Sequence, residues 1–266
     1  MDHAAVLAAY NHQVRQSTMP DGTGATFELD GAVIRRMAPL GQDGSGVFWS
    51  DLDAATADAV IAAQVRVFAS RKENFEWKQY SYDHPADLAQ RLVRAGFAAE
   101  QPESLMIAEI AEILPALDTA ELPAGVRLER VTGADGVRML AEVAEIAFGR
   151  DEPQLRESLL AQQAAEPEMA ELVVAMAGDQ PVCSARIEFL PGTEFAGLWG
   201  GGTVPEWRGR GIYRALVRYR AGRAAERGYR YLTVDASPDS RPILERVGFS
   251  CVAMTTPYIW SPSQPS

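Results

Sequence analysis

The chain has very few residues of the two types that most often form cross-links or hold metals. Its 266 residues include only two cysteines and three histidines. A disulfide framework needs several cysteine pairs, and a Cys/His metal cluster needs several ligands close together. We therefore expect no such framework, no metal site and a cytoplasmic location. The residues concerned are Cys183, Cys251, His3, His12 and His84.

Long hydrophobic runs and a basic leader are also missing. Apolar runs such as Leu172 to Ala177 are far shorter than the roughly 20 residues of a membrane helix. The stretch from Met1 to Tyr10 carries Asp2 and alanines where a signal peptide has basic residues. These features predict a protein that neither spans a membrane nor is exported.

Positive charge is scarce, since 25 basic residues face 36 acidic ones and the net charge is −11. A diffuse negative surface repels nucleic acids and anionic lipids, so we expect neither as a partner. An anionic ligand must then be captured by a local feature. The length and a hydrophobic content of 47% predict one or two globular domains.

Hydrophobic periodicity and turn residues divide the chain into strands and helices. Two prolines, Pro115 and Pro123, bracket a stretch with weak periodicity, which we interpret as a linker. We predict a domain over 1–113, a linker over 114–124, a second domain over 125–260 and a flexible tail over 261–266. The elements expected in the first domain are a helix over 4–14, strands over 26–29 and 32–37 joined by an Asp30-Gly31 turn, a strand over 47–49, a helix over 54–71, a strand over 75–81 and a helix over 85–94. Those expected in the second are strands over 126–130, 172–177, 182–190, 195–204, 229–235 and 251–260, and helices over 134–148, 154–165, 211–227 and 242–247.

An internal repeat relates the two halves at an offset of 152 residues, with six identities around a shared Gly-Phe pair. At the same offset Asp58 stands where the second copy has Arg210, and the first copy has no glycines there. Because a carboxylate repels phosphate, we expect the first domain to bind no cofactor. The identities are Asp83, Asp87, Leu92, Arg94, Gly96 and Phe97 with Asp235, Asp239, Leu244, Arg246, Gly248 and Phe249.

The run from Thr203 to Arg214 lies between an expected strand and an expected helix. A helix start presents unpaired N–H groups and the positive end of the helix dipole, which together attract anions. Gly209 and Gly211 leave room for a phosphate to approach the backbone. The run does not match G-x-x-x-x-G-K-[ST], and it supplies only the first two glycines of G-x-G-x-x-G.

The sequence from Arg208 to Tyr213 resembles the acyl-CoA signature R/Q-x-x-G-x-G/A of the GNAT N-acetyltransferase superfamily, except that Tyr213 replaces the usual Gly or Ala. The resemblance extends from about residue 125 to 260. It implies two GNAT-like modules of α/β (α+β) class, the first degenerate, each with a mixed, mostly antiparallel sheet flanked by helices. It also implies acetyl-CoA as acyl donor. The residues implied in its binding are Thr203, Val204, Arg208, Gly209, Arg210, Gly211, Ile212, Tyr213, Arg214 and Ser237.

In this family the pantetheine arm pairs with the edge of a strand that parts from its neighbour. The glycines over 200–202 fit a bulge that opens the sheet, and they fit a flexible bend equally well. Ser237 falls where the family often has an Asn that binds the cofactor. The alternative role for Ser237 is a helix cap, since Pro238 follows it.

The family's usual catalytic acid, a tyrosine, falls on Leu244, which cannot donate a proton. We take Glu194, Glu206 and Tyr258 as candidate catalytic residues, with Glu188 and Tyr213 as further possibilities. Proximity of amine and thioester alone already contributes several kcal/mol.

The sequence therefore predicts an acyl-CoA-dependent N-acyltransferase that acetylates a small, unidentified amine. Two alternatives stay open at this point. One is an acyl-CoA-binding regulatory or structural protein with little turnover, and the other is a phosphate-binding α/β module.

Overall fold

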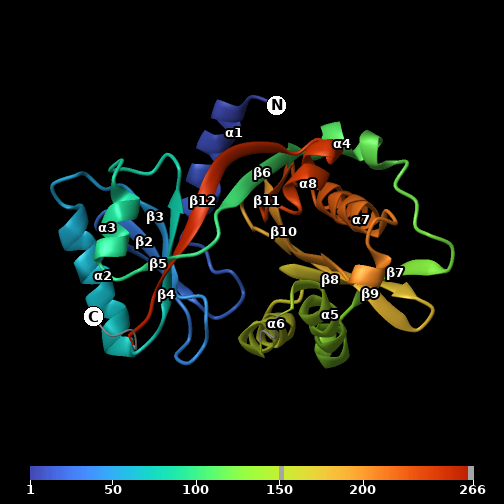
Figure 1. Ribbon diagram of the computed structural model, residues 1–266, viewed down its shortest axis with the longest axis horizontal. Helices are drawn as coiled ribbons and strands as arrows, with labels where there is room; N and C mark the ends of the chain where they lie inside the picture. The colour runs from blue at the N-terminus through green and yellow to red at the C-terminus, as the bar shows by residue number, and fades with distance from the viewer. Residues whose placement is uncertain (150–152, 263–266) are drawn as a thin grey trace. The chain divides into compact units, whose positions relative to one another are not determined.

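The structure is a computed structural model that describes residues 1–149 and 153–262. Its backbone contacts divide the chain into two compact units (Figure 1). The N-terminal unit contains His3–Leu105, Asp235–Pro238 and the chain from Cys251 onward. The C-terminal unit contains Met106–Val234 and Asp239–Ser250, together with the first two residues. The units thus exchange segments, whereas the domains predicted over 1–113 and 125–260 are continuous stretches.

The N-terminal unit begins with a helix that ends in a π-helical turn and continues with strands and two further helices. Its sheet has the strand order β1-β2-β3-β4-β12, and β5 pairs with β12. The pairs are antiparallel except for β3 and β4, which run parallel. The elements are α1 (His3–Tyr10), η1 (Asn11–Arg15), β1 (Thr26–Asp30), β2 (Val33–Met37), β3 (Gly46–Ser50), α2 (Ala57–Arg71), β4 (Phe75–Tyr80), α3 (Leu88–Arg94), β5 (Ala98–Ala99) and β12 (Ser250–Trp260).

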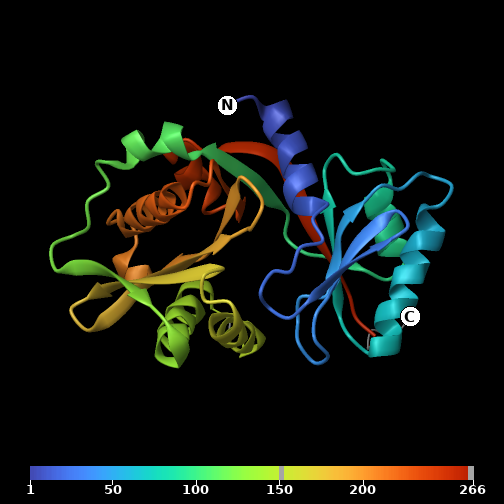
Figure 2. The same cartoon turned by 180° about the vertical axis from the view of Figure 1, so that it is seen from behind.

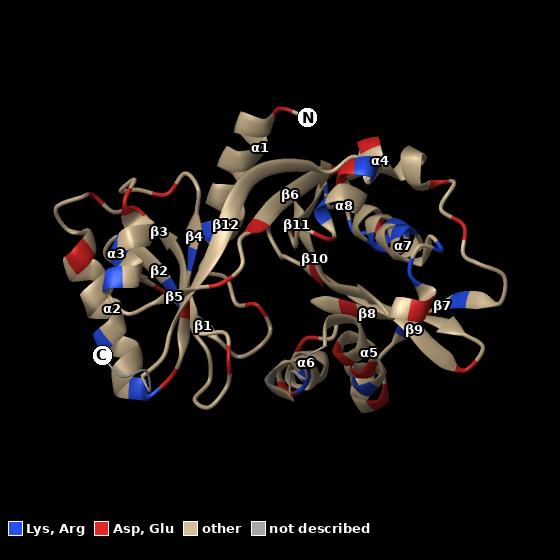
Figure 3. Ribbon diagram, in the orientation of Figure 1, with Lys and Arg blue, Asp and Glu red and all other residues tan. Residues whose placement is uncertain are grey.

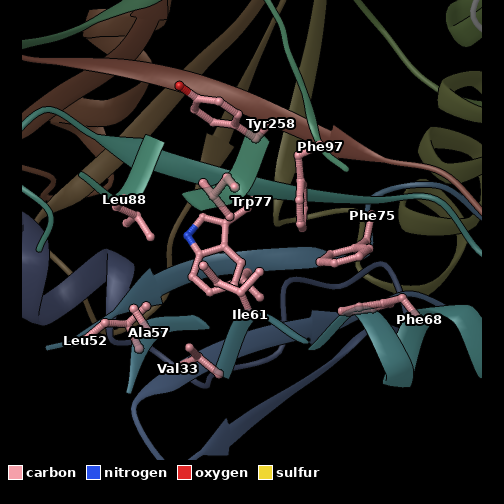
Figure 4. Packing of buried hydrophobic residues seen from close by; sticks show 12 residues of the cluster. Val33, Leu52, Ala57, Ile61, Phe68, Phe75, Trp77, Leu88, Phe97 and Tyr258 are labelled. Carbon is pink, nitrogen blue, oxygen red and sulfur yellow. The ribbon is translucent and has the colours of Figure 1, made fainter. Parts of the chain in front are cut away.

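Aromatic side chains dominate the core of this unit. The indole of Trp77 lies at its centre, 1% exposed, with Ile61 from α2 and Val33 from β2 nearby (Figure 4). Phe75 stacks on Phe68 with ring centroids 4.1 Å apart and meets Phe97 edge-on at 5.1 Å. Such pairs add to the stabilisation from burial alone.

The C-terminal unit carries a sheet of order β6-β11-β10-β9-β8-β7. Helices α5 and α6 lie on one face of β8, β9 and β10, and α7 lies on the other (Figures 1 and 2). The elements are β6 (Glu103–Glu109), α4 (Ile110–Leu117), β7 (Val126–Val131), α5 (Gly133–Phe148), α6 (Pro153–Ala165), β8 (Ala170–Ala177), β9 (Gln180–Phe189), β10 (Phe195–Thr203), η2 (Pro205–Trp207), α7 (Ile212–Glu226), β11 (Tyr231–Ala236) and α8 (Arg241–Val247). Together with the mostly antiparallel pairing, this layering confirms the predicted α/β (α+β) fold class.

Two local predictions were wrong. The segment expected to begin a linker at Leu114 is helical to Leu117, with Pro115 inside the helix. Burial of Ile110, Ile113 and Leu117 on one face of α4 outweighs the loss of one N–H donor. In the first hairpin Asp30 pairs with Val33, so the two turn residues are Gly31 and Ala32 rather than Asp30 and Gly31.

The two units repeat one order of elements. Each unit has a strand, then a helix, then a second strand parallel to the first, and these are followed by a short helix and a strand. The first three elements are β3, α2 and β4 in the N-terminal unit, and they correspond to β10, α7 and β11. This agrees with the repeat found in the sequence. The predicted tail over 261–266 lies outside the described residues from 263 onward. Across the described ranges no helix is long and apolar enough to cross a membrane.

Removing the indole from the N-terminal core tests this packing. We expect Trp77→Ala to lower the free energy of unfolding by about 3–5 kcal/mol, because it leaves a large cavity in a close-packed cluster. Urea unfolding followed by circular dichroism measures the change. Val93→Ala is the control, since Val93 lies in α3 of the same unit and is 55% exposed; we expect it to change stability by no more than about 0.5 kcal/mol. Equal unfolding midpoints for the two variants would contradict the description of the core.

Candidate active site

Strands β10 and β11 run together for only a short distance. Their parallel pairing covers Phe195, Ala196 and Gly197 on β10, opposite Tyr231 to Thr233 on β11. Beyond these residues β10 continues to Thr203 and β11 to Ala236 without further pairing to each other. From Leu198 onward β10 therefore presents an edge of backbone groups that β11 does not use, which we call the free edge (198–203).

A bulge interrupts β10 where the free edge begins. The register with β9 shifts between Trp199 and Gly202, and Gly200 adopts a φ of +57°, a conformation that other residues rarely take. A Cβ on Gly202 would stand 2.9 Å from the Phe148 ring of α5. These contacts confirm that the glycines form a bulge.

The chain after the free edge turns sharply into helix α7. Gly209 has a φ of +74°, and Gly211, the N-cap of α7, has a φ of +81°. The first ladder hydrogen bond runs from Ala215 N to Gly211 O, so the N–H groups before Ala215 lack partners within the helix. The turn therefore offers glycine-lined space and several outward N–H donors at the positive end of a 15-residue helix.

Arginines brace this turn and add positive charge to it (Figure 3). Arg208 donates from Nε to Thr203 O at 3.1 Å and from Nη2 to Ala147 O at 3.0 Å. The guanidinium of Arg210 lies 4.6 Å from the Trp207 ring centroid. Arg214 donates to Ala116 O at 3.3 Å. All three arginines remain exposed.

Tyr213 departs from the family pattern, yet its ring does not fill the turn. It lies under β10, where a Cβ on Gly201 would stand 2.8 Å from Tyr213 Cε2. The glycine at 201 thus makes room for the tyrosine at 213. Burial raises the pKa of the Tyr213 hydroxyl, so it stays protonated at neutral pH.

Ser237 follows β11 and is exposed. The predicted capping role of Ser237 was wrong, because the N-cap of α8 is Ser240. Three residues separate the end of β11 from that cap, and it is Pro242, not Pro238, that occupies the first turn. Ser237 is therefore left at the end of β11, outside the helix.

The candidate carboxylates lie at opposite ends of β10. Glu194 precedes the paired end of the strand, and its carboxylate is 3.8 Å from Arg230 Nη1. The eight residue steps from Phe195 to Thr203 span roughly 25 Å at about 3.3 Å per residue, so the structure does not bring Glu194 to the turn. Glu206 lies in η2 beside the turn and is exposed.

Tyr258 belongs to another environment. It lies in β12 within the hydrophobic cluster of the N-terminal unit and is 7% exposed. Burial raises its pKa. Its position identifies it as a packing residue of that core.

Two further positions bear on the chemistry of acyl transfer. Leu244, at the position of the usual acid, is completely buried in α8. Glu188 accepts a hydrogen bond from Arg186 Nε at 2.9 Å within β9, which holds its carboxylate in an ion pair. Neither side chain is a free proton donor.

Two buried polar residues next to the free edge were not among the site residues predicted from the sequence. Cys183 on β9 shares a 3.0 Å hydrogen bond with Thr203 Oγ1, and burial raises the pKa of its thiol to about 11, which makes it unreactive. Arg220 on α7 is 1% exposed. A signal for Arg220 was present, because it lies four residues after Leu216 on the buried face of the helix.

Comparison with known proteins gives a family for part of the chain. Residues 137–249 match the sequence model of the Acetyltransferase (GNAT) family. No curated protein matches the chain in sequence.

Solved structures share the fold over nearly the whole chain. A GCN5-related N-acetyltransferase from Kribbella flavida has a TM-score of 0.69 at 18% identity, covering 99% of this chain and 96% of that one. A tandem GNAT protein from the clavulanic acid biosynthesis pathway has a TM-score of 0.64 at 12% identity, covering 99% and 95%. A GCN5-related N-acetyltransferase from Sphaerobacter thermophilus has a TM-score of 0.57 at 16% identity, covering 90% and 83%. Residues 137–249 therefore form a domain of the GNAT acetyltransferase family, and the chain as a whole shares its fold with a tandem GNAT protein.

Proposed function

We propose that the C-terminal unit binds acetyl-CoA and transfers its acetyl group to the amine of a small acceptor. The observation that carries the proposal is the free edge of β10, which leads directly into the glycine turn at the start of α7. The chain thus offers a backbone edge followed directly by an anion-binding helix start. A donor with an amide-containing arm and a pyrophosphate fits this order.

Each part of the donor has a counterpart in the chain. The N–H groups and arginines over 208–214 would hold the pyrophosphate, since they combine donors, positive charge and space. The free edge would pair with the amides of the pantetheine arm as an added strand does. Thr203 ends this edge, with its carbonyl bonded to Arg208. Val204 lies beyond it, because its N–H donates to Val182 O and its carbonyl accepts from Trp207 N. Ser237 at the end of β11 would face the same opening.

Transfer needs a neutral amine and a polarised thioester. An alkyl ammonium, with a pKa near 10, must lose its proton before it can attack. N–H groups of the free edge that β11 does not use would donate to the thioester carbonyl and stabilise the charge that develops on its oxygen. Among the three candidate catalytic residues, Glu206 is the one next to the turn. We assign most of the rate enhancement to the positioning of the amine against the thioester.

A second function is favoured by one observation, the buried Leu244 in place of an acid. It is an acyl-CoA-binding protein with little or no turnover. Both functions require the donor to bind, and they differ only in whether CoA thiol is released.

Release of thiol separates the two functions. We expect the full chain to release CoASH from acetyl-CoA in the presence of at least one member of a broad panel of small amines, measured with a thiol-reactive chromophore. The control is the same mixture without amine, which reports hydrolysis. Binding of acetyl-CoA without amine-dependent release for any acceptor would favour the binding protein.

Charge at the helix start is tested by a matched pair of variants. We expect Gly211→Asp to weaken acetyl-CoA binding at least tenfold more than Gly211→Asn, measured by calorimetric titration. Both side chains have nearly the same shape and bear the same strain at a φ of +81°, so the difference isolates the repulsion between carboxylate and pyrophosphate. Equal affinities for the two variants would place the pyrophosphate elsewhere.

The fit between Gly201 and Tyr213 predicts compensation. Gly201→Ala should weaken acetyl-CoA binding by about tenfold, because its Cβ would stand 2.8 Å from the Tyr213 ring and displace the bulge. Gly201→Ala combined with Tyr213→Ala should recover most of that loss, since the clash is gone. If the two effects simply add, the ring does not set the shape of the bulge.

A further inference from the structure

Arg220 carries a buried charge that no carboxylate among the described residues pairs with. Its side chain is buried, and it donates from Nε to Leu216 O at 3.1 Å and from Nη1 to Arg186 O at 3.3 Å. Nη2 has no partner of good hydrogen-bond geometry among the described residues, although the Tyr213 hydroxyl lies close enough to interact with the guanidinium. None of the ion pairs among the described residues involves Arg220.

A buried cation of this kind is costly. Desolvation disfavours the charged form, and burial lowers the pKa of Arg220. Proteins usually pair such a group with a carboxylate or replace it with an apolar residue of similar volume, which is often neutral or stabilising. A buried arginine without a carboxylate partner among the described residues points to a role other than stability.

The guanidinium lies directly under the bulge. Nη2 is 3.6 Å from the point where a Cβ on Gly201 would stand. The acceptor of its Nη1 hydrogen bond, Arg186, is the residue of β9 paired with Trp199 at the start of the bulge. The groups that face it are Tyr213 on its own helix and Cys183 and Arg186 on β9. Neither the hydroxyl nor the thiol is ionised at neutral pH, so the local potential is positive.

We propose that the buried charge of Arg220, which lies under the bulge, stabilises the negative charge that develops during acyl transfer. In this step the amine nitrogen forms a bond to the acyl carbon, and the C–S bond breaks with its electron pair going to sulfur. The proton that the amine loses passes to water, from which the thiolate is later protonated. The fixed positive charge stabilises the oxygen and the sulfur as they become negative. The charge of Arg220 thus stabilises the transition state at a site where Leu244 cannot donate a proton. The inference rests on the proposed function, because it places the thioester at the free edge.

Two substitutions separate charge from packing. Arg220→Gln keeps N–H donors and removes the charge, whereas Arg220→Lys keeps the charge and removes the planar fork. We expect Arg220→Gln to lower kcat at least tenfold while Kd for acetyl-CoA changes less than threefold and Tm does not fall by more than about 2 °C. We expect Arg220→Lys to retain most of kcat. If kcat and Tm fall together in both variants, Arg220 is a structural brace and the inference is overturned.

A second measurement needs no acceptor. A nearby cation favours thiolate over thiol, so CoASH bound to the wild-type protein should titrate below the ordinary thiol pKa of about 8.5. Ultraviolet absorbance of the thiolate, recorded against pH, should show this value rising by about one unit in Arg220→Gln and staying in place in Arg220→Lys. If CoASH binds and titrates identically in all three proteins, the inference fails and the proposed function stands. If CoASH does not bind to the wild-type protein, the proposed function fails as well.

Discussion

The parting of β10 from β11 is the constraint on which the rest of the candidate site depends. A parallel pair that stops after three residues leaves backbone donors and acceptors unused inside a sheet, and such groups are costly unless something pairs with them. Glycines make this break feasible, because Gly200 takes a positive φ and Gly201 leaves room for Tyr213 beneath the strand. The turn into α7 then places a helix start at the end of the same edge. Binding of a donor along the edge would satisfy the groups that the fold leaves open.

The N-terminal unit has the same junction and uses it differently. Its parallel strands β3 and β4 pair at only two positions, Gly46 and Val47 on β3. At the next residue of β3 the backbone oxygen of Phe48 accepts a hydrogen bond from Arg15 Nε at 3.2 Å. Arg15 is buried and also forms a bidentate ion pair with Asp83 at 2.9 and 3.0 Å. In the N-terminal unit the side chain of Arg15 therefore bonds to the diverging strand, whereas in the C-terminal unit the corresponding edge is the free edge.

Strong local patterns made most of the fold predictable from the sequence. The strand predicted over 195–204 is β10 (Phe195–Thr203), and the helix predicted over 211–227 is α7 (Ile212–Glu226), because glycines and an amphipathic stretch mark their ends. The helix through Pro115 was missed, since the packing that overrides the proline comes from residues distant in sequence. The return of Asp235–Pro238 and of the chain from Cys251 onward to the N-terminal unit depends on contacts between residues distant in sequence, which no local pattern encodes.

The glycines of the candidate site could be predicted from the sequence, but the directions of its side chains could not. The turn over 208–214 follows from spacing and residue type alone. The ring of Tyr213 turns under the strand because Gly201 leaves room for it. The burial of Arg220, without a carboxylate partner among the described residues, depends on the packing of α7 against β9. Glu194 was proposed from its place on a central strand, but only the pairing shows that it lies at the closed end of β10. Long-range contacts thus decide which polar residues reach the free edge.

The measurement that tests the central claim most directly is amide hydrogen exchange with and without saturating acetyl-CoA. If the donor pairs with the free edge, protection should increase for amides within 198–203 and for the first turn of α7, and amides of β3 should be unchanged. Binding of acetyl-CoA with no added protection at the free edge, or with new protection confined to the N-terminal unit, would contradict the account.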